Sequence, residues 1–279
     1  MEVPNETAEK NRELWDKTAQ IYIEKTGAVG WIYINRPEKY NALKIQMWEQ
    51  IPKCVEILDN DIDVRAVIIT GVGGKAFSTG ADIHDIASGV GDKGIQETNR
   101  LAIRNGQRAL ARARKPVIAM IDGLCIGGGC GLAIHCDVRF ASEGSRFAIT
   151  PAKLGIVYPL NDTKELVDLV GPSRAKMLLF SADQIDAVKA LDIGLVDEVV
   201  KVEDIREKAI AFAARIAELS AFSIQHMKSN IQEILDGQID DDERTSILFN
   251  EAHDADDGLE GFRAYAEKRK PDFRWNGSS

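Results

Sequence analysis

Apolar residues recur in two different rhythms along the first part of the chain. Residues 20–24 and 30–35 form two short strand-like runs around a turn at 25–28. Over residues 45–58 the apolar positions recur every three or four residues, which predicts a helix with one buried face. The β-branched run at 64–70 (VRAVIIT) then predicts a buried parallel strand.

The same alternation continues to about residue 141. A glycine-containing loop at 89–94, which we expect to be mobile, precedes a helical pattern at 99–113. Apolar runs at 116–121 and 138–141 predict two further strands. Strands that alternate with helices in this way predict an α/β fold in which the helices cover a sheet.

The last third of the chain has a different pattern, in which helical spacing dominates and glycine and proline become sparse. The predicted helices are 173–180, 185–191, 202–219, 223–236 and 241–255. We therefore divide the chain into an N-terminal arm (1–18), an α/β core (19–199) and a helical region (200–279).

Two glycine-containing loops follow apolar strands and precede predicted helices. They cover residues 76–83 (AFSTGADI) and 123–131 (GLCIGGGCG). Backbone N–H groups at a helix start attract negative charge, so two such loops can direct paired donors at one developing oxyanion. Tight turns and close packing explain either loop taken alone. Both loops lack the lysine of a phosphate-binding loop and the glycine spacing of a dinucleotide-binding fingerprint.

Composition narrows the classes of partner. A net charge of −9 argues against nucleic acid, because phosphate contacts need a basic surface. The sequence has neither an apolar run near the ~18 residues of a membrane span nor a secretory signal, so we expect a cytoplasmic protein with no membrane partner. The four cysteines and four histidines lack the spacing of metal ligands, and we predict no metal.

Four segments occur in an order that is typical of one family. They are NRP…NAL at 35–43, FSTGADI at 77–83, KPVIA at 115–119 with GGG at 127–129, and EKRKP at 267–271. Together they resemble the enoyl-CoA hydratase/isomerase (crotonase) superfamily over nearly the whole chain. The resemblance implies a crotonase-like ββα spiral core with a C-terminal helical trimerisation region, assembled as a homo-trimer or a dimer of trimers.

The resemblance also implies a reaction type and a set of site residues. The substrate would be an acyl-CoA thioester, so that coenzyme A arrives with the substrate and no cofactor is bound permanently. The backbone N–H groups of Ala81 and Gly128 would hold the thioester oxygen as it becomes an enolate. The residues implied to contact coenzyme A are Lys39, Ala42, Asp82, Ile83 and Lys268.

Two positions depart from the hydratases of this family. Those enzymes use two glutamates to activate water and to protonate carbon, whereas this chain has Gly131 and Pro151 at the matching places. Neither side chain can transfer a proton. The segment 150–158 (TPAKLGIVY) instead resembles the methylmalonyl-CoA decarboxylase branch, which places a tyrosine beside the substrate carboxylate. Tyr158 and Thr150 are then the candidates to orient a leaving carboxylate.

We therefore rank decarboxylation of a malonyl-type acyl-CoA above double-bond isomerisation, and both above hydration or hydrolysis. The decarboxylase branch can carry a glutamate and a histidine where this chain has Gly131 and Ala81. His84 and Asp85 could act as acid or base in an isomerase, although such a pair is more often a solvated helix start. A non-catalytic scaffold or RNA-binding homologue is the alternative from another class, and the acidic charge and the two loops argue against it.

Overall fold

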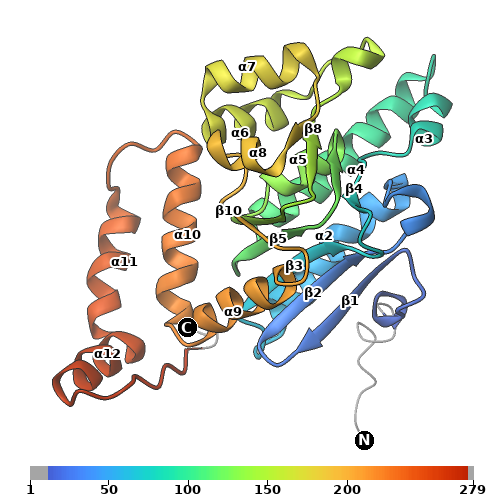
Figure 1. Cartoon of the computed structure of the whole chain (residues 1–279). Helices are drawn as coiled ribbons and strands as arrows, with labels where there is room; N and C mark the ends of the chain where they lie inside the picture. The colour runs from blue at the N-terminus through green and yellow to red at the C-terminus, as the bar shows by residue number, and fades with distance from the viewer. Residues whose placement is uncertain (1–11, 276–279) are drawn as a thin grey trace, which may run out of the picture.

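Two β-sheets covered by helices form the core of the computed structural model, which describes residues 12–275 (Figure 1). The larger sheet has six strands in the order β1-β2-β3-β5-β7-β10, and the smaller has four in the order β4-β6-β8-β9. In the larger sheet only the β1–β2 pair is antiparallel. In the smaller sheet β4, β6 and β8 are parallel and β9 is antiparallel.

The elements have the following bounds. The strands are β1 (Ile21–Thr26), β2 (Val29–Ile34), β3 (Ala66–Gly71), β4 (Ala76–Ser78), β5 (Val117–Ile121), β6 (Leu124–Ile126), β7 (Val138–Ser142), β8 (Arg146–Ala148), β9 (Ile185–Asp186) and β10 (Glu198–Val200). The α-helices are α2 (Ile45–Asn60), α3 (Ile83–Ser88), α4 (Lys93–Ala111), α5 (Gly128–Ile134), α6 (Leu160–Val170), α7 (Pro172–Ser181), α8 (Ala187–Asp192), α9 (Ile205–Ala217), α10 (Ala221–Leu235), α11 (Glu243–Asp254) and α12 (Asp256–Ala266). Short 3₁₀ turns lie at Arg12–Trp15, Pro37–Lys39 and Pro151–Leu154.

Successive turns of the chain contribute one strand to each sheet. β3 is followed by β4, β5 by β6 and β7 by β8, and at least one helix follows each pair. This repeating strand–strand–helix path is a ββα spiral. The α/β fold predicted from the alternating pattern is therefore confirmed.

Alternate side chains of the central strands enter two apolar clusters, as the two-residue period of a strand requires. Ile32 and Ile69 face helices α2, α4 and α5, in the cluster that also contains Trp48. Trp31 and Ile68 face the opposite side, where α9 packs. Helix α9, the first helix of the predicted helical region, thus covers one face of the larger sheet.

The start of α4 differs from the prediction. The helix begins at Lys93, not at residue 99, and so most of the expected loop at 89–94 is a short connection between two helices. The Asp92 side chain accepts hydrogen bonds from the N–H groups of Gly94 and Ile95, at 2.8 and 3.1 Å. This is an ordinary N-cap, and it stabilises a start that the hydrophobic pattern alone did not reveal.

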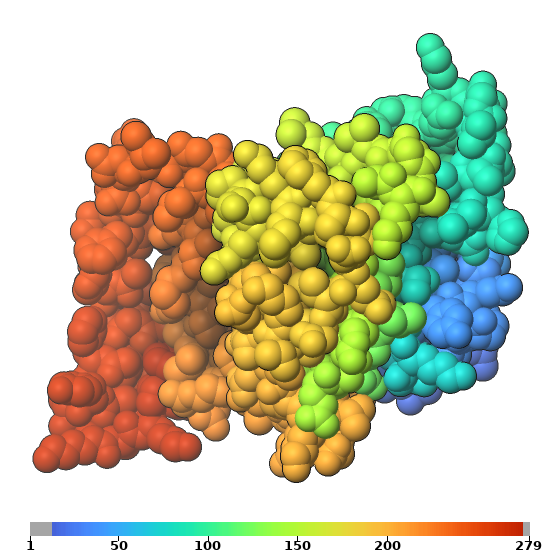
Figure 2. All heavy atoms as spheres, turned by 45° about the horizontal axis from the view of Figure 1, so that its top comes forward, coloured from blue at the N-terminus to red at the C-terminus, as the bar shows by residue number. Residues whose placement is uncertain are grey.

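The two ends of the chain differ in how they join the core. Of the predicted N-terminal arm only residues 12–18 are described, and within them Leu14 is buried in the larger apolar cluster. Helices α10 to α12 stand beside the core as a separate block, coloured orange to red in Figures 1 and 2. None of the helices within residues 12–275 is both long and apolar enough to cross a membrane.

Candidate active site

The smaller sheet brings three loops to one edge. β4, β6 and β8 are neighbours and run parallel, so their carboxyl ends lie side by side. The chain then continues into the loops that carry Ala81, Gly128 and Thr150. The topology therefore assembles three of the predicted site residues.

The loops holding Ala81 and Gly128 touch through their backbones. A Cβ atom added to Gly128 would lie 3.2 Å from the Gly80 Cα and 3.3 Å from the Ala81 nitrogen. A Cβ atom on Gly80, whose φ is +85°, would lie 2.5 Å from the Gly128 nitrogen. Gly80 must be glycine because of its positive φ and this clash, whereas a Cβ at Gly128 would fit only if the two loops moved apart by a few tenths of an ångström.

The main-chain donors of this contact have no protein acceptor. On either side of Ala81, the Leu43 N–H donates to the Gly80 carbonyl and the Asp82 N–H donates to the Leu43 carbonyl, both at 2.8 Å. Gly128 is the first residue of α5, a position whose N–H has no acceptor inside a helix. In the hydrogen bonds of residues 12–275, neither the Ala81 nor the Gly128 N–H is used. Both remain available to a ligand.

A buried ion pair joins the first motif to the first glycine loop. Arg36 Nη1 donates to Asp82 Oδ2 at 2.5 Å and to the Ala42 carbonyl at 3.0 Å. Asp82 Oδ1 also accepts the His84 N–H at 2.9 Å, which caps α3. The Arg36 guanidinium holds the pKa of Asp82 below its usual value. The Asp82 side chain thus has a structural role beside Ala81, and the contact of Asp82 with coenzyme A stays a prediction.

Asn41 fastens the same region, a function that the sequence did not reveal. Its φ is +55°, and its side-chain amide donates to the Ala76 carbonyl at 2.7 Å. The Asn41 carbonyl accepts the Ser78 hydroxyl at 2.8 Å, and that hydroxyl oxygen accepts the Gly80 N–H at 3.1 Å. The NAL and FSTGAD motifs are therefore one hydrogen-bonded unit.

Three polar side chains converge on Gly131, the position that the resemblance matched to a hydratase glutamate. A Cβ atom added there would lie 2.5 Å from Gln107 Nε2, 3.3 Å from the Tyr158 hydroxyl and 3.4 Å from Asp162 Oδ2. The Tyr158 hydroxyl is buried and has no hydrogen-bond partner within the described part of the chain. Thr150 lies near Gly127 instead, with its Oγ1 3.5 Å from the place that a Cβ atom added to Gly127 would occupy.

Asp162 and His135 form a buried acid–base pair behind this space. Asp162 Oδ2 accepts from Gln107 Nε2 at 3.2 Å, and its Oδ1 lies 3.9 Å from His135 Nε2. Burial raises the pKa of Asp162 and lowers that of His135. Neither residue was predicted as a site residue, because only the packing of α5 and α6 brings Asp162 to Gly131 and His135.

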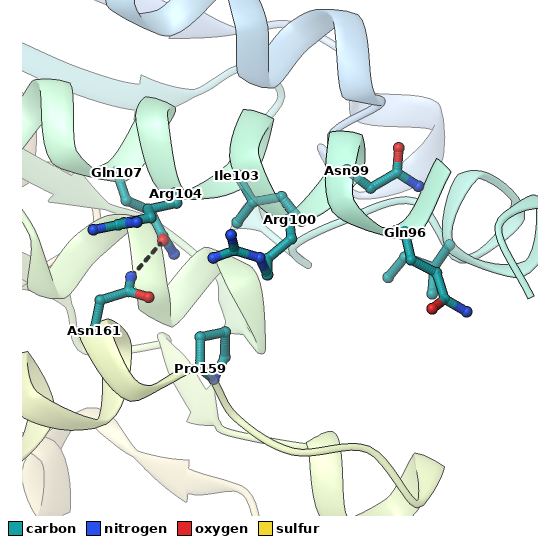
Figure 3. Close-up of a pocket in the computed structure, with 9 residues that line it drawn as sticks. Gln96, Asn99, Arg100, Ile103, Arg104, Gln107, Pro159 and Asn161 are labelled. Atoms are coloured by element: carbon teal, nitrogen blue, oxygen red, sulfur yellow. Dashed lines mark hydrogen bonds between the residues drawn. The ribbon is translucent and has the colours of Figure 1, made fainter. Parts of the chain in front are cut away.

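A cavity of about 200 Å³ opens between α3, α4 and the segment before α6. Asn161 Nδ2 donates to Gln107 Oε1 at 3.4 Å across one end of it (Figure 3). Arg100 and Arg104 reach the cavity from α4. Since Gln107 also contacts Asp162, this end of the cavity lies next to the acid–base pair.

For the other predicted coenzyme A contacts, the structure gives only their position in the fold. Lys39 and Ile83 are exposed near the two motifs, whereas Lys268 follows α12, which lies at the opposite end of the molecule from α3 (Figure 1). Asp85 Oδ2 accepts the Ile45 N–H at 2.9 Å and thereby caps α2. The described residues contain no cluster of three or more His, Cys, Asp or Glu side chains arranged to hold a metal ion.

Unused main-chain donors from two loops at one edge of a ββα spiral define the crotonase class of fold and site. The sequence matches the model of the enoyl-CoA hydratase/isomerase family over residues 24–276, and the protein belongs to that family. The resemblance inferred from the four motifs is thus confirmed.

Relatives and solved structures agree with this assignment. The chain is 34% identical to a short-chain-enoyl-CoA hydratase of Clostridium acetobutylicum over 253 residues, covering 90% of this chain and 95% of that protein. It is 36% identical to a crotonyl-CoA hydratase of Syntrophomonas wolfei over 263 residues, covering 91% and 97%. A crystal structure of a putative enoyl-CoA hydratase/isomerase family protein from Hyphomonas neptunium matches with a TM-score of 0.90 at 34% identity, covering 92% and 98%.

Proposed function

We propose that this protein decarboxylates a malonyl-type acyl-CoA through a thioester enolate. The thioester oxygen would accept hydrogen bonds from the Ala81 and Gly128 N–H groups. The observation that carries the proposal is the combination of Gly131 and Pro151 at the two glutamate places with a buried, unpartnered Tyr158 hydroxyl beside Gly131. Hydration needs two proton-transferring groups at those places, but loss of carbon dioxide does not.

The step conserves atoms and electrons. The bond between the α-carbon and the carboxylate breaks, carbon dioxide leaves, and the electron pair of that bond enters the enolate. A proton then adds to the α-carbon and yields the saturated acyl-CoA. The two N–H donors stabilise the charge that develops on oxygen, which is the largest single contribution in many enzymes of this kind.

Tyr158 would orient the leaving carboxylate, and Thr150 would add a hydrogen bond. Burial, and after it the charge of Asp162, raise the pKa of Tyr158 well above its usual value. The hydroxyl therefore keeps its proton at neutral pH and can donate it in a hydrogen bond to a carboxylate.

A mass-spectrometric screen tests the reaction. The purified protein is incubated separately with methylmalonyl-, ethylmalonyl-, 2-enoyl- and 3-enoyl-CoA. We expect loss of carbon dioxide from a malonyl-type substrate. A gain of water on a 2-enoyl-CoA, or a mass-neutral shift of a 3-enoyl-CoA, with no carbon dioxide from either malonyl substrate would replace decarboxylation by hydration or isomerisation.

Replacing Tyr158 by phenylalanine should slow decarboxylation by roughly 10- to 100-fold, the effect of losing one hydrogen bond to a charged group. Since the hydroxyl has no protein partner within residues 12–275, the melting temperature should not fall. Steady-state carbon dioxide release measures the first effect and a thermal melt the second. The control is Tyr22→Phe in the larger sheet, which should leave turnover unchanged. Equal turnover of Tyr158→Phe and wild type would remove Tyr158 from the mechanism.

Double-bond isomerisation is the second candidate. The Asp162 carboxyl beside Gly131 favours it, because a single acid–base group can move a proton between two carbons of a 3-enoyl-CoA. Several relatives are named hydratases, but the residues at 131 and 151 of this chain weigh against water addition. The same screen distinguishes these reactions.

Restoring glutamate at Gly131 should not create a hydratase. The new Cβ would lie 2.5 Å from Gln107 Nε2, so that Gln107 must move and its contact with Asp162 is disturbed. We expect no water addition and a loss of stability of about 1–3 kcal/mol, the usual effect of overpacking. Gly144→Glu is the matched control, because a Cβ at Gly144 meets no atom within 4 Å. Efficient hydration by Gly131→Glu would show that Pro151 needs no acidic replacement.

We also propose that the protein assembles as a trimer or a dimer of trimers through α10 to α12. Large apolar side chains are exposed there, among them Met227, Ile231, Ile234, Phe249 and Phe262. Assembly would allow Lys268 of one subunit to approach the coenzyme A site of another. Within a subunit, Lys39 and Ala42 beside the Arg36–Asp82 pair are the proposed contacts.

A further inference from the structure

We propose that Asp162 is the proton donor of this site, and that it takes the place of the glutamate missing at position 131 from a different helix. The inference rests on the proposed thioester enolate. The inference adds to the proposed mechanism by naming the group that gives the α-carbon its proton. The hydratase glutamate would extend from α5, whereas Asp162 extends from the first turn of α6.

The geometry places the carboxyl group where that glutamate side chain would begin. Asp162 Oδ2 lies 3.4 Å from the point where a Cβ of residue 131 would stand. Gln107 Nε2 lies 2.5 Å from this point and the Tyr158 hydroxyl lies 3.3 Å from it, so three polar side chains surround the place where a glutamate side chain would begin. Asp162 is only 2% exposed, so a substrate that enters this space would meet its carboxyl group without competing water.

Two amides hold the carboxyl group in position. Gln107 Nε2 donates to Oδ2 at 3.2 Å, and Asn161 Nδ2 donates to Oδ1 at 2.7 Å. Both amide side chains also line the cavity of Figure 3. Asp162 is therefore held in place by two residues that line the cavity.

His135 provides a route by which Asp162 can recover its proton. His135 Nδ1 lies 2.6 Å from the Gly131 carbonyl oxygen, which can only accept, so the ring carries its proton on Nδ1. The unprotonated Nε2 then faces Asp162 Oδ1 at 3.9 Å. A proton can pass between the two groups with a small movement of either side chain.

The proton balance closes within the site. Decarboxylation leaves the electron pair on the enolate. This pair then forms the new bond between the α-carbon and the proton that Asp162 gives up. Asp162 is left as a carboxylate, which the Gln107 and Asn161 amides stabilise until a proton returns by way of His135. The net reaction consumes one proton from solvent and releases one carbon dioxide.

The charged and titratable groups around Asp162 determine the pH dependence. They are His135 at the end of α5, Tyr158 in the preceding segment and Glu165 on the same helix. Burial raises the pKa of Asp162, and the charge on a protonated His135 lowers it. Proton donation should therefore decline as the pH rises through the pKa of Asp162.

Hydrogen–deuterium exchange at the α-carbon of propionyl-CoA in D₂O tests the inference without requiring decarboxylation. We expect the wild type to introduce deuterium, and Asp162→Asn to do so at least about 100-fold more slowly, the scale of general acid–base catalysis. Asp168→Asn on the same helix is the control and should exchange like the wild type. His135→Gln should slow the exchange, because it removes the group through which Asp162 exchanges its proton with solvent.

A further variant guards against a purely structural effect. Asp162→Glu keeps the carboxyl group and should recover part of the exchange that Asp162→Asn loses, even if the latter is less stable. Wild-type exchange rates in Asp162→Asn or in His135→Gln, or no exchange by the wild type, would each overturn the inference. Exchange that depends on Asp162 without carbon dioxide from any malonyl substrate would remove only the proposed decarboxylation.

Discussion

Replacing Gly128 by proline should lower turnover by roughly 10²- to 10³-fold, which is about 3 kcal/mol of transition-state stabilisation. Proline removes the N–H group that, with the N–H of Ala81, is proposed to bind the thioester oxygen. Gly128 is the first residue of α5, where a helix accepts proline because the N–H has no intrahelical partner. Steady-state turnover on the substrate found in the screen measures the effect.

The control for this variant separates lost chemistry from a lost helix start. Glu243→Pro makes the same change at the first residue of α11, far from the glycine loops, and should leave turnover unchanged. Gly128→Ala keeps the donor but brings a Cβ within 3.2 Å of the Gly80 Cα, so an intermediate loss is expected. Wild-type turnover in a folded Gly128→Pro protein would exclude this N–H group from the oxyanion site.

Sequence patterns predicted the α/β core because its longest elements have strong periodicity. The run 64–70 corresponds to β3, and the spacing over 45–58 corresponds to α2. Strands β4, β6 and β8 have only three residues each, too few to establish an alternation, yet their carboxyl ends form the site. The glycines beyond these strands were visible in the sequence, and so the two loops were predicted although the second sheet was not.

The acid–base pair could not be found in the same way. Gln107 and Asp162 are 55 residues apart and meet only because α4 and α6 pack on either side of α5. The local sequence around an aspartate in the first turn of a helix does not reveal whether its side chain is buried, caps the helix or faces solvent. The resemblance matched Gly131 to a hydratase glutamate, but only three-dimensional packing revealed that the Asp162 carboxyl group lies beside it.

Removing the Asp82 carboxylate should destabilise the protein by about 3–5 kcal/mol, because it leaves the buried Arg36 guanidinium without its counter-ion. Both side chains are at most 9% exposed, so water cannot replace the lost partner. The variant Asp82→Ala also loses the cap of α3, and both losses act next to Ala81. Chemical denaturation of the wild type and the variant at pH 7, at the same protein concentration, measures the difference.

The pH dependence gives a second test of the same ion pair. Folding lowers the pKa of Asp82, so the folded state binds its proton less tightly than the unfolded state. The stabilisation is therefore fully present above the ordinary aspartate pKa of about 4 and is lost as the pH falls through the lower folded value. In Asp82→Ala, the free energy of unfolding should therefore fall less on acidification than in the wild type, because no Asp82 carboxylate is present to be protonated.

An exposed pair of the same chemical type provides the control. Glu97 and Arg100 form a salt bridge at 2.6 Å with side chains 54% and 50% exposed, and Glu97→Ala should change the stability little because solvent screens such a pair. If Asp82→Ala costs no more than Glu97→Ala, the Arg36–Asp82 pair does not hold the two motifs together. Ala81 would then owe its position to the backbone contacts of Leu43 and to the hydrogen bonds of Asn41 and Ser78 alone.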